Sequence, residues 1–287
     1  MTDAERLTSG FVQALRESPF RIAPERSHEL LATMGGEPWI LEIINGPANF
    51  EAFPKSKEIE GTHAALLSLW AVTASVSILW RLARAAIASG QSQIAIEPGG
   101  PGSEIIELKN AALALIRSEA FSWSGAPAEP NTLAEPSSHD GLINNLFLAA
   151  ASMVILHECG HIALGHQVHT TLMHQQEREA DAWVVKWILE QAPGEPQREF
   201  RTLAICIAFI WIGLIDEVRQ TTATHPPASQ RFADAFDAFG DIANESTALE
   251  ISHYALKAFF DPTTDLPQAN SAKDGFIDGL IGLNRRR

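Results

Sequence analysis

The chain has 287 residues, of which 46% are hydrophobic, so it is long enough to bury one large core or two modest ones. Its formal net charge of −14 argues against nucleic acid as the main partner, because phosphate backbones recruit basic surfaces, and it disfavours anionic membranes. Two cysteines and the polar start MTDAERLTSG indicate neither a disulfide framework nor a secretory leader, so we expect a cytoplasmic protein.

Residues 1–60 are expected to form an N-terminal segment that contains a small β element and packs on the rest of the chain. A short helix over 11–17 is followed by Pro19 and Pro24, which predict an extended stretch. Strand character at 39–44, then a turn and a second strand at 49–53, predict a β-hairpin. An edge strand of this kind is able to bind a substrate backbone by strand addition, although an ordinary structural hairpin is the simpler interpretation.

Residues 61–287 are expected to form one helical catalytic domain, so the predicted fold class is mainly α with a small β element, an α+β protein. Apolar residues recur at helical spacing over most of this part. The helices are expected at about 60–89, 104–119, 142–166, 176–191, 198–219, 228–242 and 246–260.

Two apolar runs raise the question of a membrane. Residues 64–80 carry no charge and approach the shortest length that spans a bilayer, and a second run covers 203–215. Four Ser or Thr residues in the first run, and the amphipathic continuation after it, favour a buried core helix. Membrane association is therefore not expected, and a peripheral place at the inner membrane is the alternative.

The stretches 98–103 and 124–140 are rich in Gly, Pro, Ser and Ala and predict loops. The second is longer than most connections and precedes the helix that carries the motif described next. It is either a lid or binding element or an ordinary surface connection.

The string HECGH at 157–161 is the most specific feature of the chain. His157 and His161 differ by about 40° around a helix axis and about 6 Å along it, so their imidazoles point at one place. Glu158 flanks the same face, which suits a carboxylate that takes a proton from water at a metal without binding the metal. The string predicts a zinc hydrolase.

A catalytic zinc ion normally has three protein ligands, so a third must come from elsewhere. EREAD at 177–181 begins a predicted helix on which Glu177 and Asp181 share one face. Glu179 lies about 200° from Glu177, on a face expected to be solvated. We therefore predict Glu177 as the ligand and Asp181 as the acceptor for the free ring nitrogen of a ligating histidine.

Alternatives to a catalytic metal site are less favoured. An HExxH string also occurs by chance, but the apolar run 146–155 predicts a buried helix, where unpaired imidazoles and carboxylates are costly. A structural zinc site is disfavoured because Cys159 points away from His157. His166 is out of the register that metzincins use for a third histidine. His169 and His174 fall in the expected connection and are not predicted as ligands.

The string THPPASQR at 224–231 adds two candidates. Its consecutive prolines fix a turn, so His225 and Arg231 are predicted at the edge of a cleft, where either is able to stabilise a developing oxyanion. The alternative is a helix start with a surface histidine.

HExxH, ExxAD and THPPxxxR together resemble the gluzincin peptidases of the HtpX type. With SPFRIAPE at 18–25 and EREADAWVVKWIL at 177–189, the chain resembles more closely the phage-exclusion Lit-type peptidases, over positions 18–231. SPFRIAPE carries particular weight, because it lies far from the metal motifs.

This resemblance implies a zincin-like fold with an HExxH active-site helix and one Zn²⁺ per chain. It also implies a soluble endopeptidase of bacterial anti-phage defence that cuts elongation factor Tu when a phage-derived peptide triggers it. By resemblance, His157, His161 and Glu177 are the ligands, and Glu158 is the general base. Asp181 is the supporting aspartate, and His225 and Arg231 lie near the reacting carbonyl.

Two other functions stay open. One is an HtpX-like housekeeping peptidase, and the other is a non-catalytic regulatory or binding module that keeps the zincin fold. The presence of Glu158 favours an enzyme, since a module without activity has no need of the base.

Overall fold

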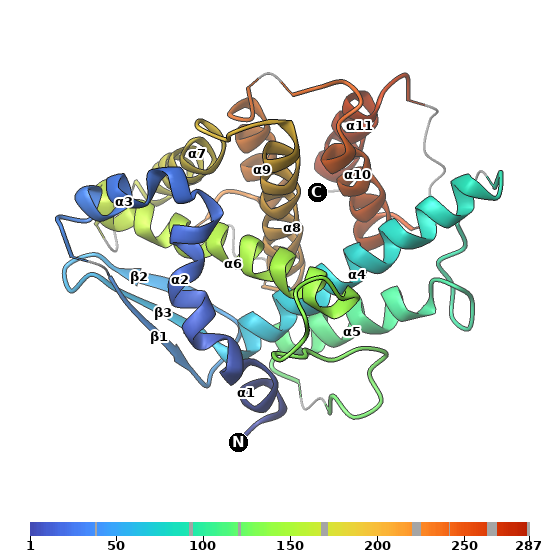
Figure 1. Ribbon diagram of the computed structural model, residues 1–287, viewed down its shortest axis with the longest axis horizontal. Coiled ribbons are helices and arrows are strands. Elements are labelled where there is room, and N and C mark those ends of the chain that lie inside the picture. The colour runs from blue at the N-terminus through green and yellow to red at the C-terminus, as the bar shows by residue number, and fades with distance from the viewer. Residues whose placement is uncertain are drawn as a thin grey trace.

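Helix α6 (His139–Ala163) runs through the middle of the molecule, and the other elements pack around it (Figure 1). The protein is seen here in a computed structural model, which describes residues 1–37, 39–91, 94–119, 122–167, 172–219, 225–240, 242–262 and 269–285. Further helices are α1 (Asp3–Thr8), α2 (Val12–Ile22), α3 (Ser27–Thr33), α4 (His63–Ala88), α5 (Ser103–Ile116), α7 (Met173–Leu189), α8 (Glu195–Arg219), α9 (Ala228–Asp237), α10 (Thr247–Phe260) and α11 (Ala272–Arg285).

Strands β1 (Ile40–Ile44), β2 (Phe50–Phe53) and β3 (Glu58–Thr62) form the sheet of the described chain, in the order β1-β3-β2. The β3 strand pairs in parallel with β1 and antiparallel with β2. The hairpin predicted between 39–44 and 49–53 is therefore wrong, because β3 lies between these strands and the actual hairpin joins β2 to β3. The broader prediction of a mainly helical protein with a small N-terminal sheet is confirmed.

The β3 strand also changes where the first long helix begins. That helix was expected from about residue 60, but it starts at His63, and the Thr62 hydroxyl caps it by accepting from the Ala65 N–H. The β3 strand crosses residue 60 and leads directly into α4. The division of the chain at that residue stays a prediction.

Helix α2 continues through Pro19, where the sequence predicted an extended stretch. Proline removes the backbone N–H that would donate to the Leu15 carbonyl. The Ser18 hydroxyl donates to that carbonyl instead, at 2.9 Å, and the helix runs on to Ile22. A turn of 3-10 helix follows at Pro24–Arg26, so the expectation of extended chain is wrong there too.

The string SPFRIAPE and the arginine after it join the N-terminal segment to α7 and α8. Arg201, buried on α8, donates to both oxygens of Glu25 at 2.6 and 2.9 Å, and to the Ile188 carbonyl at 2.9 Å. Arg26 lies over the Trp187 ring, 3.9 Å from its centroid, and donates to the Trp187 carbonyl at 3.1 Å. These contacts fix the C-terminal part of α7, which gives a structural reason for a motif far from HECGH.

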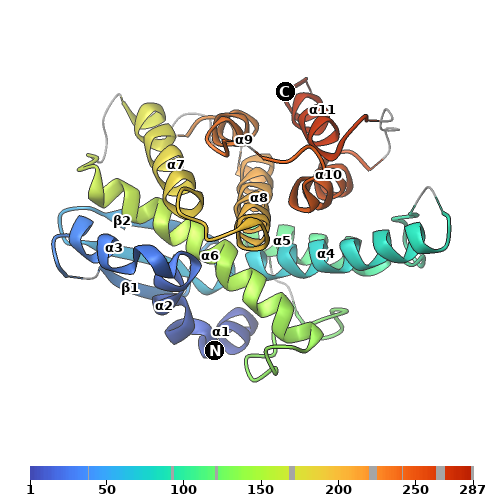
Figure 2. The same ribbon diagram turned by 45° about the horizontal axis from the view of Figure 1, so that its top comes forward.

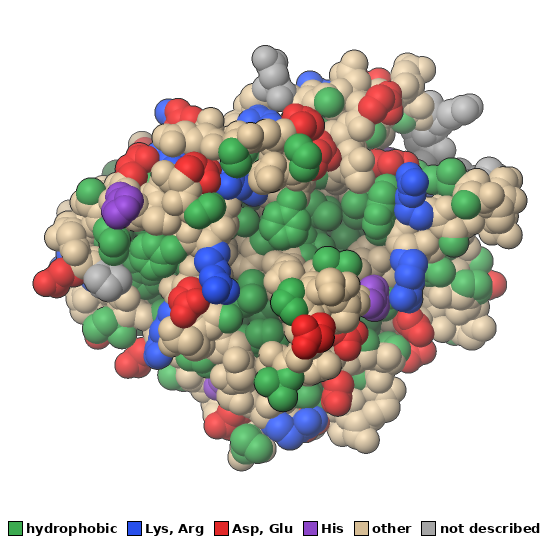
Figure 3. All heavy atoms as spheres, in the orientation of Figure 1, with side chains coloured by type: hydrophobic (Ala, Val, Ile, Leu, Met, Phe, Trp, Pro, Cys, Tyr) green, Lys and Arg blue, Asp and Glu red, His purple; other side chains and the backbone are tan. Residues whose placement is uncertain are grey.

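Within the described chain, α4 and α6 are long and apolar enough to cross a membrane by length and composition. In each helix 78% of the most apolar window is buried inside the fold, as in a core helix. Ser68, in the run 64–80, accepts a hydrogen bond at 2.8 Å from the indole of Trp211 in the run 203–215. Figure 3 shows charged side chains interspersed with apolar ones on the face that it displays. These observations favour core helices for both runs.

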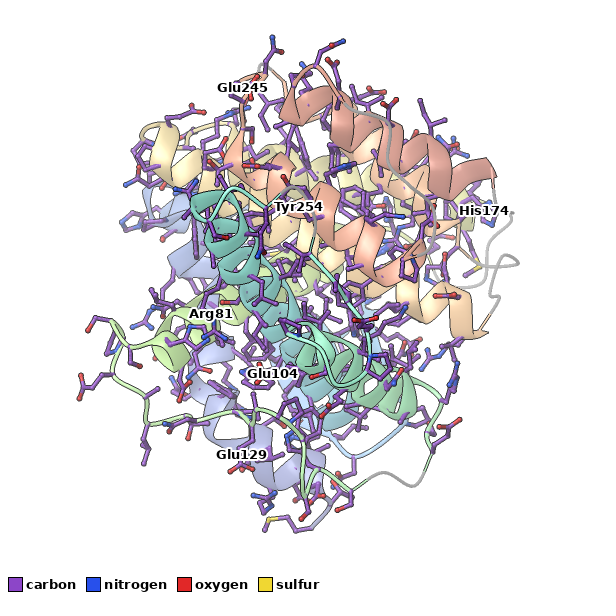
Figure 4. All side chains as sticks on the ribbon, turned by 90° about the vertical axis from the view of Figure 1, so that its right-hand side faces the viewer. Arg81, Glu104, Glu129, His174, Glu245 and Tyr254 are labelled. Atoms are coloured by element: carbon purple, nitrogen blue, oxygen red, sulfur yellow. The ribbon has the colours of Figure 1, made fainter. Side chains whose placement is uncertain are left out.

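The loop 124–140 lies at the N-terminal end of α6, where it covers a cavity of about 950 Å³ beside α4 and α5. Figure 4 shows Arg81 and Glu104 near this loop, whereas His174, at the start of α7, lies on the other side of the molecule. Because α6 rises about 1.5 Å per residue, its first turn is about 27 Å from His157. The loop is therefore not a lid over HECGH.

Candidate active site

The HECGH string lies in the last turns of α6 and brings its two histidines together. The Nε2 atoms of His157 and His161 are 3.1 Å apart. His157 and Glu158 are buried, and His161 is half-buried. The helix thus gathers two imidazoles and a carboxylate at one place beneath the surface.

Helix α7 packs against this part of α6 and carries Glu177 to the same place (Figure 2). Glu177 Oε2 lies 3.4 Å from His157 Nε2, and Oε1 lies 3.4 Å from His161 Nε2. The two helices pack closely at Gly160, where an added Cβ would lie 3.2 Å from Trp183 Cε3 and 3.4 Å from the Ala180 Cα. The glycine of HECGH and the alanine of EREAD therefore lie at the contact between the helices that carry these side chains.

The three side chains fit a metal ion. Among the described residues, His157, His161 and Glu177 form a group whose potential ligand atoms all lie within 4.8 Å of one another. Glu177 Oε2 is buried and accepts no hydrogen bond from a described residue, although a buried carboxylate oxygen normally has a partner. Two imidazoles and one carboxylate are a ligand set of catalytic zinc sites, so the residues present suit such an ion.

Asp181 and Arg231 stand behind this group. Asp181 Oδ1 is 2.9 Å from His157 Nδ1, on the side of the ring that faces away from Glu177. Burial acts to raise the pKa of Asp181, but the charges of Arg231 and His157 outweigh it and lower that pKa. Burial likewise acts to lower the pKa of His157, but the carboxylates of Asp181 and Glu177 outweigh it and raise the pKa to about 10.

The two candidates from THPPASQR occupy different surroundings. Arg231 is 5% exposed and its Nη1 lies 3.4 Å from Glu177 Oε2, and the residue also lines the small cavity that Glu158, Glu177 and His225 line. The side chain of His225 is 41% exposed, and its Nε2 lies 3.5 Å from Glu177 Oε1. Burial, partly offset by the charge of Glu177, lowers the pKa of His225, so its imidazole is neutral near pH 7. Thr224 lies outside the described residues.

His166 and Glu179, which the sequence did not predict as parts of a site, contact it. His166 Nδ1 lies 2.8 Å from His161 Nδ1, and His166 Nε2 lies 3.2 Å from Glu179 Oε2. The side chain of Glu179 is 47% exposed, so the expected solvated face is only part of its environment. His174 belongs to the first turn of α7, and His169 lies outside the described residues.

A groove passes on both sides of Glu158. One part, of about 360 Å³, is lined by β2 and by His161, His166 and Gln176. A smaller cavity of about 140 Å³ continues past Glu158 and Glu177. Its wall combines the charged residues Asp216, Arg219 and Arg231 with the apolar side chains of Phe50, Met153, Val154, Trp211, Ile212 and Ile215. Asn49, Phe50, Glu158, Glu177 and His225 line both parts. An extended chain lying along β2 would therefore pass the carboxylate of Glu158.

Comparisons with known proteins agree with a peptidase. The chain is 25% identical to the cell death peptidase of Escherichia coli (strain K12) over 233 residues, which are 76% of this chain and 77% of that protein. No solved structure matches the chain. The family model of Peptidase U49 matches residues 59–252, a span that includes HECGH, EREAD and THPPASQR. The chain therefore belongs to the Peptidase U49 family.

Proposed function

We propose that this peptidase is a zinc-dependent endopeptidase with a zincin-like fold, and that His157, His161 and Glu177 hold one Zn²⁺ per chain. The observation that carries the proposal is the meeting of these three side chains at the end of α6, with Glu158 beside them and the groove in front. The Glu177 Oε2 atom supports it, because this buried oxygen accepts no hydrogen bond from a described residue and has only longer ion-pair contacts, at 3.4 Å, with His157 and Arg231.

Each residue of the proposed site then has a role in the reaction. A bound zinc ion supplies a Lewis acid that polarises a peptide carbonyl and makes water more acidic. Glu158 takes a proton from the attacking water and gives it to the nitrogen of the leaving amine. The C–N bond then breaks, and the amine leaves in neutral form. The neutral imidazole of His225 lines the groove, and its N–H donates to the oxygen that gains negative charge. Asp181 and Arg231 hold His157 and Glu177 in place.

The shape of the groove favours cleavage within a chain. Because the groove extends to both sides of Glu158, an extended segment is able to continue in both directions from the scissile bond. Within the described chain β2 is an edge strand, since it pairs with β3 alone, and an edge offers backbone groups for strand addition. The apolar cavity beyond Glu158 suits an apolar substrate side chain.

For the biological role, we propose anti-phage defence in the bacterial cytoplasm, with elongation factor Tu as the protein substrate and a phage-derived peptide as the trigger. The support is the resemblance of SPFRIAPE and the metal motifs to Lit-type peptidases, together with the relative whose name is cell death peptidase. The acidic chain makes nucleic acid an unsuitable partner, and the burial of α4 and α6 fits a protein without a membrane anchor.

The test compares the wild type with Glu158→Gln in cells challenged with phage, using mass spectrometry of new protein termini. We expect one translation factor to be cut only in the wild type, while purified Glu158→Gln still binds zinc. Defence without any Glu158-dependent fragment would overturn the proteolytic account, and equal protection by Glu158→Gln would indicate a non-catalytic module. Cleavage of denatured protein without phage would instead indicate an HtpX-like housekeeping peptidase.

A further inference from the structure

His161 has a ring nitrogen on each side, and both are engaged. Its Nε2 faces His157 and Glu177 at 3.1 and 3.4 Å, and its Nδ1 faces His166 Nδ1 at 2.8 Å. Two ring nitrogens at this distance share one hydrogen, so one donates and the other accepts. If Nε2 of His161 is to bind a metal, it keeps its lone pair, and the hydrogen lies on Nδ1. His161 therefore donates to His166.

The same reasoning extends one residue further. Since His166 Nδ1 accepts from His161, the hydrogen of the neutral His166 ring lies on Nε2, which faces Glu179 Oε2 at 3.2 Å. Gln175 donates to the other oxygen of Glu179 at 2.7 Å and so holds the carboxylate. The result is a directed series of hydrogen bonds from His161 through His166 to Glu179.

The end of α6 places His166 in this position. Gly165 has a φ of +67°, and its N–H donates to the Ile162 carbonyl at 3.2 Å, while the His166 N–H donates to the His161 carbonyl at 3.0 Å. These two bonds form a Schellman cap, in which the second residue past the helix returns to the third residue from its end. That contact is usually hydrophobic, but here it joins two imidazoles. The backbone and the ring of His166 thus both bond to His161.

We propose that His166 and Glu179 are positioning residues that fix the tautomer and the ring orientation of His161 as a metal ligand. They do for His161 what Asp181 does for His157, with a histidine inserted between the carboxylate and the ligand. The inference rests on the proposed metal site, but it assigns a task to two residues outside the ligand set.

The first test measures zinc affinity by competition with a chromophoric chelator, and the visible spectrum of the cobalt-substituted protein. His166→Phe keeps the ring but cannot accept from His161, and we expect affinity to fall about 10- to 100-fold with an altered cobalt spectrum. His166→Asn places an oxygen near the position of Nδ1, so we expect it to restore part of the affinity. His139→Phe, at the exposed start of α6, is the matched control and should leave affinity and spectrum unchanged.

The second test measures the energetic coupling between His166 and Glu179, and the effect of substitutions at Gly165 in the Schellman cap. Glu179→Gln should weaken zinc binding in the wild type but have little further effect in His166→Phe, because the connection is already broken. Gly165→Ala should also weaken binding, since alanine resists this φ, whereas Gly165→Asn should retain it, because asparagine tolerates the left-handed region. Unfolding of the metal-free variants reports whether a loss of affinity follows from a loss of fold.

The outcomes separate this proposal from the one on which it rests. If the wild type binds no zinc, the proposed metal site fails. If the wild type binds zinc and folded His166→Phe binds it equally well with an unchanged cobalt spectrum, only the positioning role is overturned. Additive losses for His166→Phe and Glu179→Gln would also overturn it, because they would show two separate effects.

Discussion

Asp181 and Arg231 form a buried two-point ion pair, in which Arg231 Nε donates to Oδ2 at 2.8 Å and Nη2 donates to Oδ1 at 2.9 Å. The same Oδ1 contacts His157 Nδ1, and the third nitrogen of the guanidinium lies 3.4 Å from Glu177. One arginine therefore compensates two buried carboxylates, one of them a proposed metal ligand.

Replacing Arg231 by Met should destabilise the metal-free protein by about 3–5 kcal/mol, because the carboxylates of Asp181 and Glu177 lose their buried partner. Urea unfolding measures this loss. Zinc should recover part of it, since the ion compensates Glu177. Arg231→Lys is the control that keeps the charge without the two-point geometry, and it should lose less stability than Arg231→Met. Equal stability of wild type and Arg231→Met would contradict this account.

Zinc binding should release about one proton near pH 7, because the metal-free protein holds a proton on His157, whose pKa is raised to about 10. Apparent affinity should then rise about tenfold per pH unit between pH 7 and 9. Titration calorimetry in buffers of different ionisation enthalpy measures the proton. Asp181→Asn removes a carboxylate that raises this pKa, so it should release less than one proton at pH 7. Proton release that is the same in both proteins would speak against the charge of Asp181 as the cause.

The same shift affects the stability of the metal-free protein. The folded pKa of His157 lies above the ordinary value of 6.5, so its contribution to stability is fully present below about pH 6.5 and is lost as the pH rises through about 10. Metal-free protein should therefore lose stability between these values.

Glu25 should contribute to acid sensitivity, because hydrogen bonds from Arg201 hold its pKa below the usual value. A lowered folded pKa gives stability above the unfolded value of 4.5, and this stability is lost as the pH falls through the folded pKa. Because Glu25 lies at the surface, Glu25→Gln should cost only about 1 kcal/mol at pH 7, and the stability of the variant should fall less steeply than that of the wild type as the pH is lowered. Glu37→Gln, in an exposed turn, is the control, and a Glu25→Gln curve parallel to the wild type at low pH would count against this contribution.

The apolar cavity beside Glu158 should govern substrate preference. Ile215→Trp adds volume at the wall of a space of only about 140 Å³, so cleavage of peptides with a bulky apolar side chain next to the scissile bond should fall by about tenfold or more in kcat/KM. Peptides with glycine there should be affected less. Ile281→Trp, exposed on α11, serves as the control. An equal loss of kcat/KM for both peptide types would show that the cavity does not bind this substrate side chain.

Helical periodicity was sufficient to predict which of the candidate side chains share a face of their own helix. A helix fixes the angle between neighbouring side chains, so the spacing already placed His157 and His161 on one face of α6 and separated Glu177 from Glu179 on α7. The same rule does not extend past the end of a helix. The position of His166 depends on the reversal at Gly165, and the signal for it was the glycine itself, as a Schellman cap returns the following residue to the helix.

The sheet was harder to predict because its pairing is not local. A parallel partner is separated in sequence by a crossover, and nothing in the five residues Glu58–Thr62 identifies β1 as their neighbour. Arg231 presents a similar difficulty, since its partner Asp181 is fifty positions away on another helix. Such pairs are decided by how the helices pack, and no local pattern encodes them.

The contacts of the N-terminal motif set an order of events during synthesis. Glu25 and Arg26 emerge from the ribosome early, but their partners Arg201 and Trp187 lie 176 and 161 residues later in the chain. Arg231, which contacts the proposed ligand Glu177, follows later still. The site is therefore assembled only when most of the chain has been made, and a growing chain carries no finished peptidase beside the translation machinery that produces it.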